Sequence, residues 1–293
     1  MACVRIRPTS TTGAPIYNVT AAAYGLLPGT YYASLTIDWT TGSLTIPITL
    51  TVTPTSASPP VMSAIVSSAS ATPGAIAPGE IVSIFGTGIG GAPAGPQLDA
   101  SGKVATSPSQ TQVLIGGVAE PLIYASGSQT NAIVPFEVGT TGVAKVHVIS
   151  SGFASATWDA PLAPGAPSIF TSNSTGLGQA AALNQDNSIN SSSNPAARGT
   201  VVQLYATGGG ATRPAGVTGA LARTGENLAQ SVKVTIGGVD AVVQYAGSAP
   251  GEVEGLIQIN AMIPQNVAPS SFVPIALTIG GVASPIAATI AVD

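Results

Sequence analysis

Few side chains in this sequence could perform acid–base or nucleophilic chemistry. The 293 residues include one histidine, His147, and one cysteine, Cys3. His147 lies in the alternating segment 143–149 with no serine or aspartate at a spacing typical of a hydrolase triad, so we interpret it as a structural strand residue. A zinc site within one chain would need more ligands than one histidine and one cysteine supply. Cys3 allows no internal disulfide, and we interpret it as an unpaired thiol, with a cross-link to another chain as the alternative.

The twelve carboxylates are the remaining candidates for catalysis, because two acidic residues can together hydrolyse a glycosidic bond. Glu252 and Glu254 are two residues apart in a glycine-rich insertion, and Glu120 and Glu137 flank predicted loops. With five Phe, seven Tyr and two Trp, the chain offers few aromatic platforms for a sugar. We therefore predict that the protein is not an enzyme and has no catalytic, cofactor-binding or metal-binding residues.

Two polar or glycine-rich segments resemble ligand loops only superficially. Residues 184–190 (Asn-Gln-Asp-Asn-Ser-Ile-Asn) place oxygen ligands at alternating positions, but they lack the glycine and the terminal glutamate of a calcium loop. We interpret them as a capped polar turn. Residues 86–91 and 208–210 follow strands, but no helix pattern or lysine follows them, so we interpret them as tight turns rather than phosphate loops.

An internal repeat organises the rest of the chain. Residues 111–135 and 231–264 each contain an alternating strand that ends in Ile-Gly-Gly-Val, a second strand that reaches a tyrosine, and a closing Asn-Ala-x-(Val/Ile)-Pro. A tyrosine pair and an asparagine pair recur in this way: Tyr124, Tyr245, Asn131 and Asn260. We predict two tandem copies of one β-domain, in which the asparagines tie a strand end to a neighbouring loop through side-chain to backbone hydrogen bonds.

The composition predicts an all-β fold. Charged residues make up 7 % of the chain, far below the roughly 25 % of ordinary soluble domains, while 45 % of residues are hydrophobic and alternate in short runs. Val, Ile and Thr predominate, as they do in strands. We predict tandem immunoglobulin-like β-sandwiches in an elongated array. The core should come from Val, Ile and Leu, with aromatic anchors at Phe85, Tyr124, Tyr205 and Tyr245.

Proline-rich linkers divide the chain into three predicted domains. The linkers are residues 54–60 and 161–167. They separate an incomplete immunoglobulin-like domain (1–58), a first β-sandwich (59–167) and a second β-sandwich with a longer lead-in (168–293). Residues 1–53 supply about four strands, whereas an immunoglobulin-like sandwich has about seven.

The net charge of −4, with only eight Lys and Arg, argues against nucleic-acid binding. The apolar runs are too short to span a bilayer, so no membrane span is expected. Residues 1–8 lack the apolar core of a signal peptide, but the Ser, Thr, Asn and Gly-rich composition is typical of exported bacterial β-proteins. We predict an extracellular or cell-surface location, with the signal missing from this chain.

Two stretches resemble known families. Residues 26–32 (Leu-Leu-Pro-Gly-Thr-Tyr-Tyr) and 46–52 (Ile-Pro-Ile-Thr-Leu-Thr-Val) resemble the second half of BACON-type immunoglobulin-like repeats. Residues 61–293 resemble the uncharacterised C-terminal domain of exported proteins of Solibacter-type acidobacteria, through segments 166–170, 176–186, 190–199, 205–209 and 258–264. That resemblance implies export, a position behind variable partner domains and a β-sandwich related to the IPT/TIG type, but no reaction. The chain departs from the pattern at Gln129-Thr-Asn131, where the family has Gln-Ile-Asn.

Two functions remain open at this stage. The first is a non-catalytic structural protein that builds an extracellular or cell-surface filament, in which a neighbouring copy completes the N-terminal half-sandwich by adding a strand. Residues 284–292 or a loop would be the donor, and the partner would be a homo-oligomer or polymer. The second is an adhesion or carbohydrate-binding module at the C-terminus of a larger secreted protein, with a surface glycan as partner. The incomplete first domain also fits a simpler explanation, namely that its missing strands lie upstream in a longer protein.

Overall fold

The computed structural model describes residues 3–8, 17–22, 29–39, 41–52, 58–223, 225–285 and 288–293, and divides the chain into two units, Met1–Ala57 and Ser58–Asp293. Strands dominate both units, and the helical content of the described residues is one 3-10 turn, η1 (Pro108–Gln110). The prediction of an all-β fold is therefore confirmed. The side chain of Cys3 and most of the predicted linker 54–60 lie outside what the structure describes.

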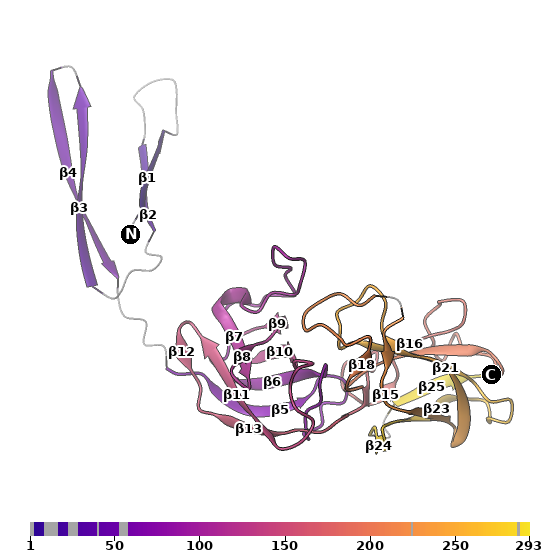
Figure 1. Ribbon diagram of the computed structural model, residues 1–293. Coiled ribbons are helices and arrows are strands. Elements are labelled where there is room, and N and C mark those ends of the chain that lie inside the picture. The colour runs from indigo at the N-terminus through magenta and orange to yellow at the C-terminus, as the bar shows by residue number, and fades with distance from the viewer. Residues whose placement is uncertain are drawn as a thin grey trace. The chain divides into compact units, whose positions relative to one another are not determined.

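The described residues of the N-terminal unit form two antiparallel strand pairs. β1 (Cys3–Pro8) pairs with β2 (Tyr17–Ala22), and β3 (Gly29–Trp39) pairs with β4 (Gly42–Val52) along their full length (Figure 1). Among the described residues neither β3 nor β4 pairs with a third strand. Several large apolar side chains of this hairpin are consequently exposed, including Tyr32, Leu44 and Ile46.

The first part of Ser58–Asp293, here called the first module (residues 61–162), contains two sheets. One has the order β5 (Val61–Ser67), β6 (Ile81–Thr87), β10 (Gln129–Ile133) and β9 (Leu122–Ala125). The other has the order β12 (Phe153–Ala154), β11 (Val143–Ser150), β7 (Thr111–Ile115) and β8 (Val118–Ala119), with β13 (Trp158–Pro161) also paired to β11. Apolar side chains of both sheets share one buried cluster, so the sheets form a sandwich.

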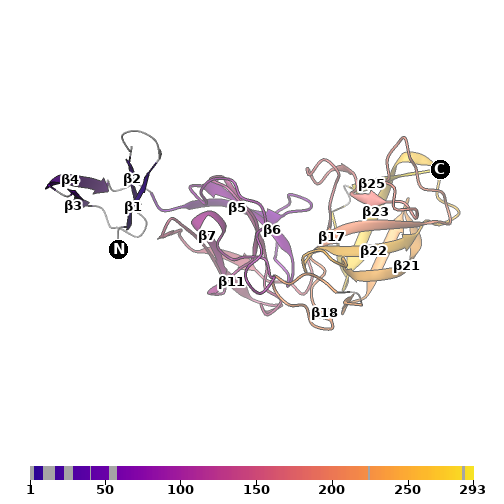
Figure 2. The same cartoon turned by 90° about the horizontal axis from the view of Figure 1, so that it is seen from above.

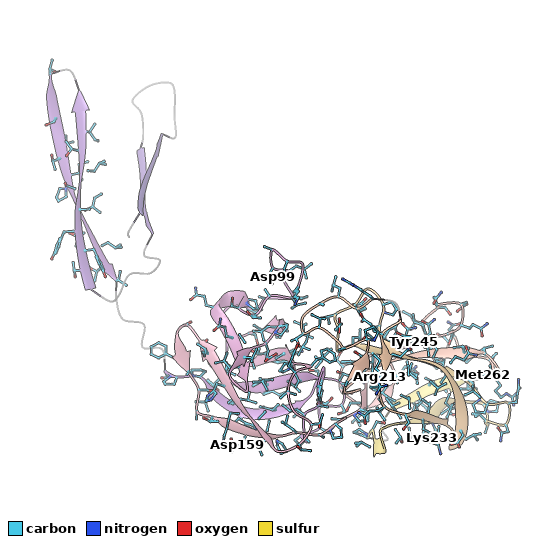
Figure 3. The ribbon with its side chains drawn as sticks, in the orientation of Figure 1. Asp99, Asp159, Arg213, Lys233, Tyr245 and Met262 are labelled. Atoms are coloured by element: carbon cyan, nitrogen blue, oxygen red, sulfur yellow. The ribbon has the colours of Figure 1, made fainter. Side chains whose placement is uncertain are left out.

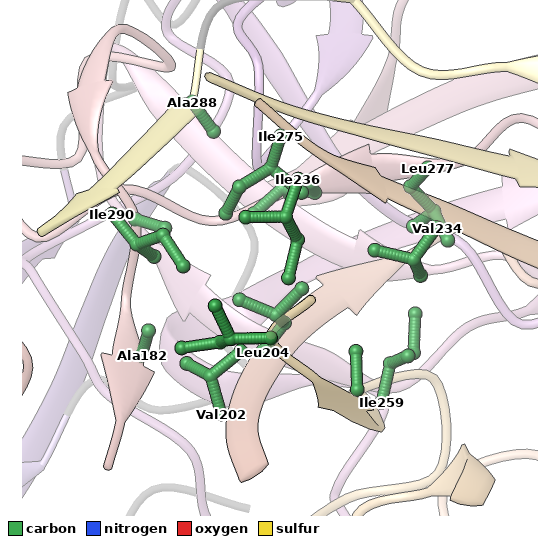
Figure 4. Packing of buried hydrophobic residues seen from close by; sticks show 14 of the residues in the cluster. Ala182, Val202, Leu204, Val234, Ile236, Ile259, Ile275, Leu277, Ala288 and Ile290 are labelled. Carbon is green, nitrogen blue, oxygen red and sulfur yellow. The ribbon is translucent and has the colours of Figure 1, made fainter. Parts of the chain in front are cut away.

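The second module (residues 168–293) is built on one long, curled sheet. Its path is β14 (Ser168–Ile169), β17 (Val201–Thr207), β22 (Ile257–Met262), β21 (Val239–Ser248), β20 (Val232–Ile236), β23 (Ser270–Ile279), β25 (Ala288–Val292) and β15 (Gly178–Gln179). Four short strands pair with this sheet or with each other. β16 (Ala182–Leu183) pairs with β17, β24 (Val282–Ala283) pairs with β23, and β19 (Asn227–Leu228) pairs with both β21 and β18 (Thr212–Arg213). Figure 2 shows β17, β22 and β21 side by side. Leu204, Ile236 and Ile275 from three different strands converge on a fully buried cluster (Figure 4).

The Ile-Gly-Gly-Val motif makes the same hairpin three times. In the first, Ile115 of β7 pairs with Val118 of β8, and both Gly116 and Gly117 have positive φ values of 63° and 89°. A two-residue turn with positive φ at both positions matches the twist of the strands and strongly favours glycine. The other two copies close β20–β21 and β23–β24 in the same way.

The expected aromatic anchors are not core residues, so this prediction was wrong. Phe85 is 36 % exposed, and the three tyrosines are half-buried. The segment from Ile81 to Phe85 is apolar at almost every position, so either of its faces could have been the inner one. The fold buries Val82 and Ile84, and because successive side chains of a strand alternate, Phe85 points to the outer face.

Candidate functional site

A row of polar side chains crosses the outer face of the sheet β5–β6–β10–β9. Asn131 of β10 lies opposite Ser83 of β6 on one side and Tyr124 of β9 on the other. Its Oδ1 accepts hydrogen bonds from Ser83 Oγ (3.1 Å) and from Gln129 Nε2 (2.9 Å). Neither Asn131 Nδ2 nor the Tyr124 hydroxyl hydrogen-bonds to any described residue. The row therefore presents an amide donor and a phenol beside an ordered acceptor.

This arrangement corrects the role expected of the repeated asparagines. Residues two apart in a strand share a face, and Gln129 and Asn131 bond to each other through their side chains rather than to a loop backbone. Gln258 and Asn260 of β22 make the same contact, also at 2.9 Å.

The row is the floor of a groove of about 500 Å³, which we call the polar groove. Its walls include Phe85 from the first module, and Phe170 and Ser174 from the second. No lining residue is charged among the described residues. A cleft of this size, with aromatic walls and a few ordered polar groups, suits a small neutral ligand or a segment of a larger one.

In the second module, two side chains of the corresponding row are hydrogen-bonded within the chain. Gln203 and Tyr245 flank Asn260 in register, as Ser83 and Tyr124 flank Asn131. Gln203 Nε2 donates to Asn187 Oδ1 (2.8 Å), and the Tyr245 hydroxyl donates to the Ser248 carbonyl (2.7 Å). The two rows thus differ at the tyrosine: Tyr245 is bonded within its own strand, whereas Tyr124 has no partner among the described residues. Asn260 Nδ2, like Asn131 Nδ2, has no partner among the described residues.

A second groove, also of about 500 Å³, adjoins the first, and we call it the apolar groove. The two grooves share Ile81, Ile123 and Phe170. Its remaining walls are almost entirely aliphatic: Pro96, Leu98, Val104, Leu221, Val253 and Leu256. Glu252, an exposed residue, is the charged member of the lining.

Buried hydrogen bonds hold the two modules together beside these grooves. The Ile81 N–H donates to Thr207 Oγ1, which donates to the Gly255 carbonyl, each at 2.8 Å. Further along, the Phe136 N–H donates to Thr218 Oγ1 (3.0 Å). The Ile81–Thr207 bond is buried and links the two modules directly, at a residue that lines both grooves.

Glu80, Glu120 and Glu254 are among the buried glutamates near this junction. Burial raises the pKa of Glu80 to about 8, even though the Ala77 N–H donates to its carboxylate (2.9 Å). Burial, followed by the negative charge of Glu137, raises the pKa of Glu120 to about 8, and neither oxygen of Glu120 has a hydrogen-bond partner. Burial also raises the pKa of Glu254, whose carboxylate accepts the Val217 N–H (2.7 Å).

Glu252 and Glu254, the acid pair considered and set aside in the sequence analysis, do not share a site. Glu252 is exposed at the rim of the apolar groove, whereas Glu254 is buried and lines a different pocket beside Glu226 and Arg223. His147 is half-buried on β11, with Thr157 Oγ1 at 3.5 Å from its Nε2. In the described part of the chain, no group of three or more His, Cys, Asp or Glu could hold a metal, and no helix is long and apolar enough to cross a membrane.

The polar and glycine-rich loops have the local roles expected of them. Asp186 Oδ1 accepts from the backbone N–H and the hydroxyl of Ser188, at 3.0 and 2.6 Å, as in a capped turn. These hydrogen bonds lower the pKa of Asp186. Gly88, Gly208 and Gly210 have positive φ values and form tight turns.

Sequence reasoning missed both grooves. Tyr124 and Asn131 are repeated residues, and the two-residue spacing of Gln129 and Asn131 was the signal that could have placed these two on one face. The walls contributed by Phe170, Leu221 and Leu256 come from distant parts of the chain and gave no local signal.

Comparison with known proteins identifies no family. No family model matches the chain, and no curated protein matches it. Similar solved structures include the surface glycan-binding protein PbSGBP-B from Prevotella bryantii, at 12 % identity over 79 % of this chain and 41 % of that one, with a TM-score of 0.25. Another is the gamma-CGTase from Alkalophilic bacillus clarkii, at 13 % identity over 95 % of this chain and 37 % of that one, with a TM-score of 0.27. The chain thus spans about two fifths of the length of each, and at these TM-scores neither likeness carries an argument about function.

Proposed function

We propose that the protein is a non-catalytic module of an exported or cell-surface protein, and that it binds a neutral carbohydrate in the polar groove. One observation carries the proposal. Asn131 and Tyr124 line the polar groove, and the Tyr124 hydroxyl has no partner among the described residues, whereas its counterpart Tyr245 donates to the Ser248 carbonyl of its own strand. The groups left free in this row are those that a ligand would satisfy.

The chemistry of the groove fits a sugar. Asn131 Nδ2 can donate to a sugar hydroxyl, and the Tyr124 hydroxyl can both donate and accept. The rings of Phe85 and Phe170 offer apolar surface to the C–H face of a pyranose. The lining without charge favours a neutral ligand, because a charged group would be desolvated there without an ionic partner.

A glycan array tests this proposal with two matched pairs of variants. Asn131→Ala and Tyr124→Phe should each weaken retention of the bound glycan by roughly five- to tenfold, the value of about one hydrogen bond. Asn260→Ala and Tyr245→Phe make the same changes in the row of the second module, outside the polar groove, and should leave binding unchanged. Failure of the chain to retain any neutral glycan would refute the function, and equal effects of the two pairs would refute the site.

A second candidate function, assembly into a filament by strand addition, is favoured by the hairpin β3–β4. Tyr32 is 81 % exposed, Leu44 51 % and Ile46 40 %, and no third strand pairs with the hairpin among the described residues. Open edges with apolar side chains are templates for a strand from another chain. β25 is not a free donor, because it is already paired with β23 and β15, so another segment would have to be added.

Deletion of residues 1–58 distinguishes assembly through this hairpin from other contacts. The remaining residues contain both buried clusters and should fold without the N-terminal unit. Electron microscopy should show polymers of the full chain and discrete particles of the truncated one. Polymers of both would show that the hairpin is not the assembly element.

A further inference from the structure

The polar groove and the apolar groove lie next to each other on the surface. Ile81, Ile123 and Phe170 line both, so a ligand seated against Tyr124 and Asn131 can extend past Phe170 without leaving the surface of the protein. The chemistry changes along this path. Amide and hydroxyl groups line the first part, and aliphatic side chains line the second.

The walls of the apolar groove are held in place by the backbone. On the first module, Leu98 and Val104 form a β-bridge, and Asp99 caps the tight loop between them by accepting hydrogen bonds from the Ser101 and Lys103 N–H groups at 2.8 and 3.1 Å (Figure 3). On the second module, Leu221 and Val253 form another bridge. The groove is therefore formed before a ligand arrives.

The two walls are also tied to each other. The Val104 N–H donates to the Gly219 carbonyl of the opposite module, at 2.8 Å. The walls are thus fixed at a separation that leaves Leu98 58 % exposed and Leu221 44 % exposed. Because the walls hold these aliphatic side chains apart, their apolar surface is removed from water only when an apolar ligand covers it, and that burial would stabilise the complex.

We propose that the ligand is an amphipathic glycoside, with a neutral sugar in the polar groove and a single alkyl or acyl chain in the apolar groove. This inference rests on the proposed carbohydrate function and specifies its ligand class. A glycan without an apolar chain would leave Leu98 and Leu221 exposed to solvent. A free fatty acid would bring a carboxylate into a lining whose charged member, Glu252, is also negative. A sugar joined to an uncharged chain can fill both grooves, with its sugar in the polar groove and its chain in the apolar groove.

The test is a titration of the full chain, by calorimetry, with methyl, butyl, hexyl and octyl glucosides and the corresponding maltosides below their micelle concentrations. Affinity should rise about fourfold with each added methylene until the groove is filled. Leu221→Asp and Leu98→Asp should abolish this dependence on chain length and leave binding of the methyl glycosides unchanged. Leu44→Asp makes the same change at an exposed leucine outside the groove and should have no effect.

The outcomes separate this inference from the proposed function. Binding of methyl glycosides without any gain from longer chains would overturn the inference and leave the carbohydrate function standing. Binding of octanol as tightly as octyl glucoside, unaffected by Asn131→Ala, would overturn both, because the sugar would then contribute nothing. Binding of none of the alkyl glycosides, or loss of methyl glycoside binding in Leu221→Asp, would also contradict the proposed ligand.

Discussion

Replacement of Glu120 by glutamine should flatten the dependence of folding stability on pH. Glu120 is fully buried, its two carboxylate oxygens have no hydrogen-bond partner, and its pKa rises from an ordinary value of 4.5 to about 8. The unfolded chain therefore releases this proton first as the pH rises. A carboxyl group whose pKa is higher in the folded state destabilises the fold progressively between the two pKa values.

The magnitude follows from the pKa difference. Each pH unit between the two values is equivalent to about 1.4 kcal/mol per group, so Glu120 should lower the free energy of unfolding by about 5 kcal/mol between pH 4.5 and about 8. The pKa of Glu80 is also raised to about 8, so its ionisation likewise lowers the free energy of unfolding as the pH rises. The loss is complete above both folded pKa values, so the curve should level off there.

Urea unfolding at several pH values between about 5 and about 8 measures this slope. Glu120→Gln should remove the contribution of one proton, which is about half of the combined slope of Glu80 and Glu120. Glu252→Gln, at an exposed glutamate, is the control and should keep the wild-type slope. An unchanged slope in Glu120→Gln would show that the folded protein solvates or pairs this carboxylate, and the argument from burial would fail.

Two further predictions concern the junction and the turns. Thr207→Val removes the hydroxyl that accepts the buried Ile81 N–H, and should lower the free energy of unfolding by about 1–3 kcal/mol in urea; no change would mean that water replaces the bond. Gly208→Ala should cost more than Gly238→Ala in thermal unfolding. Both positions have positive φ, but a Cβ at Gly208 would overlap the neighbouring linker backbone, whereas Gly238 faces open space; equal losses would rule out the overlap.

The strands and their turns could be predicted because the signals that specify them are local. Period-two alternation marks a strand wherever one face is buried, and Ile-Gly-Gly-Val sets a two-residue turn through the positive φ of both glycines. Spacing along the chain does not place side chains in space: Glu252 and Glu254 are two residues apart in sequence, yet one is exposed and the other is buried.

The sequence by itself thus determined the all-β class, the positions of most strands and the hairpins that join them, since each depends on residues close together in the chain. Tertiary structure decided which face of an apolar strand is inside. In β6 that choice buries Val82 and Ile84 and places Phe85 in the wall of a groove. It also decided that Tyr124 lines a groove without a hydrogen-bond partner among the described residues, whereas its counterpart Tyr245 is bonded within the chain. Whether a sheet face is covered depends on loops such as those that carry Asn187 and Phe170, and their contacts join residues far apart in sequence, where spacing carries no information.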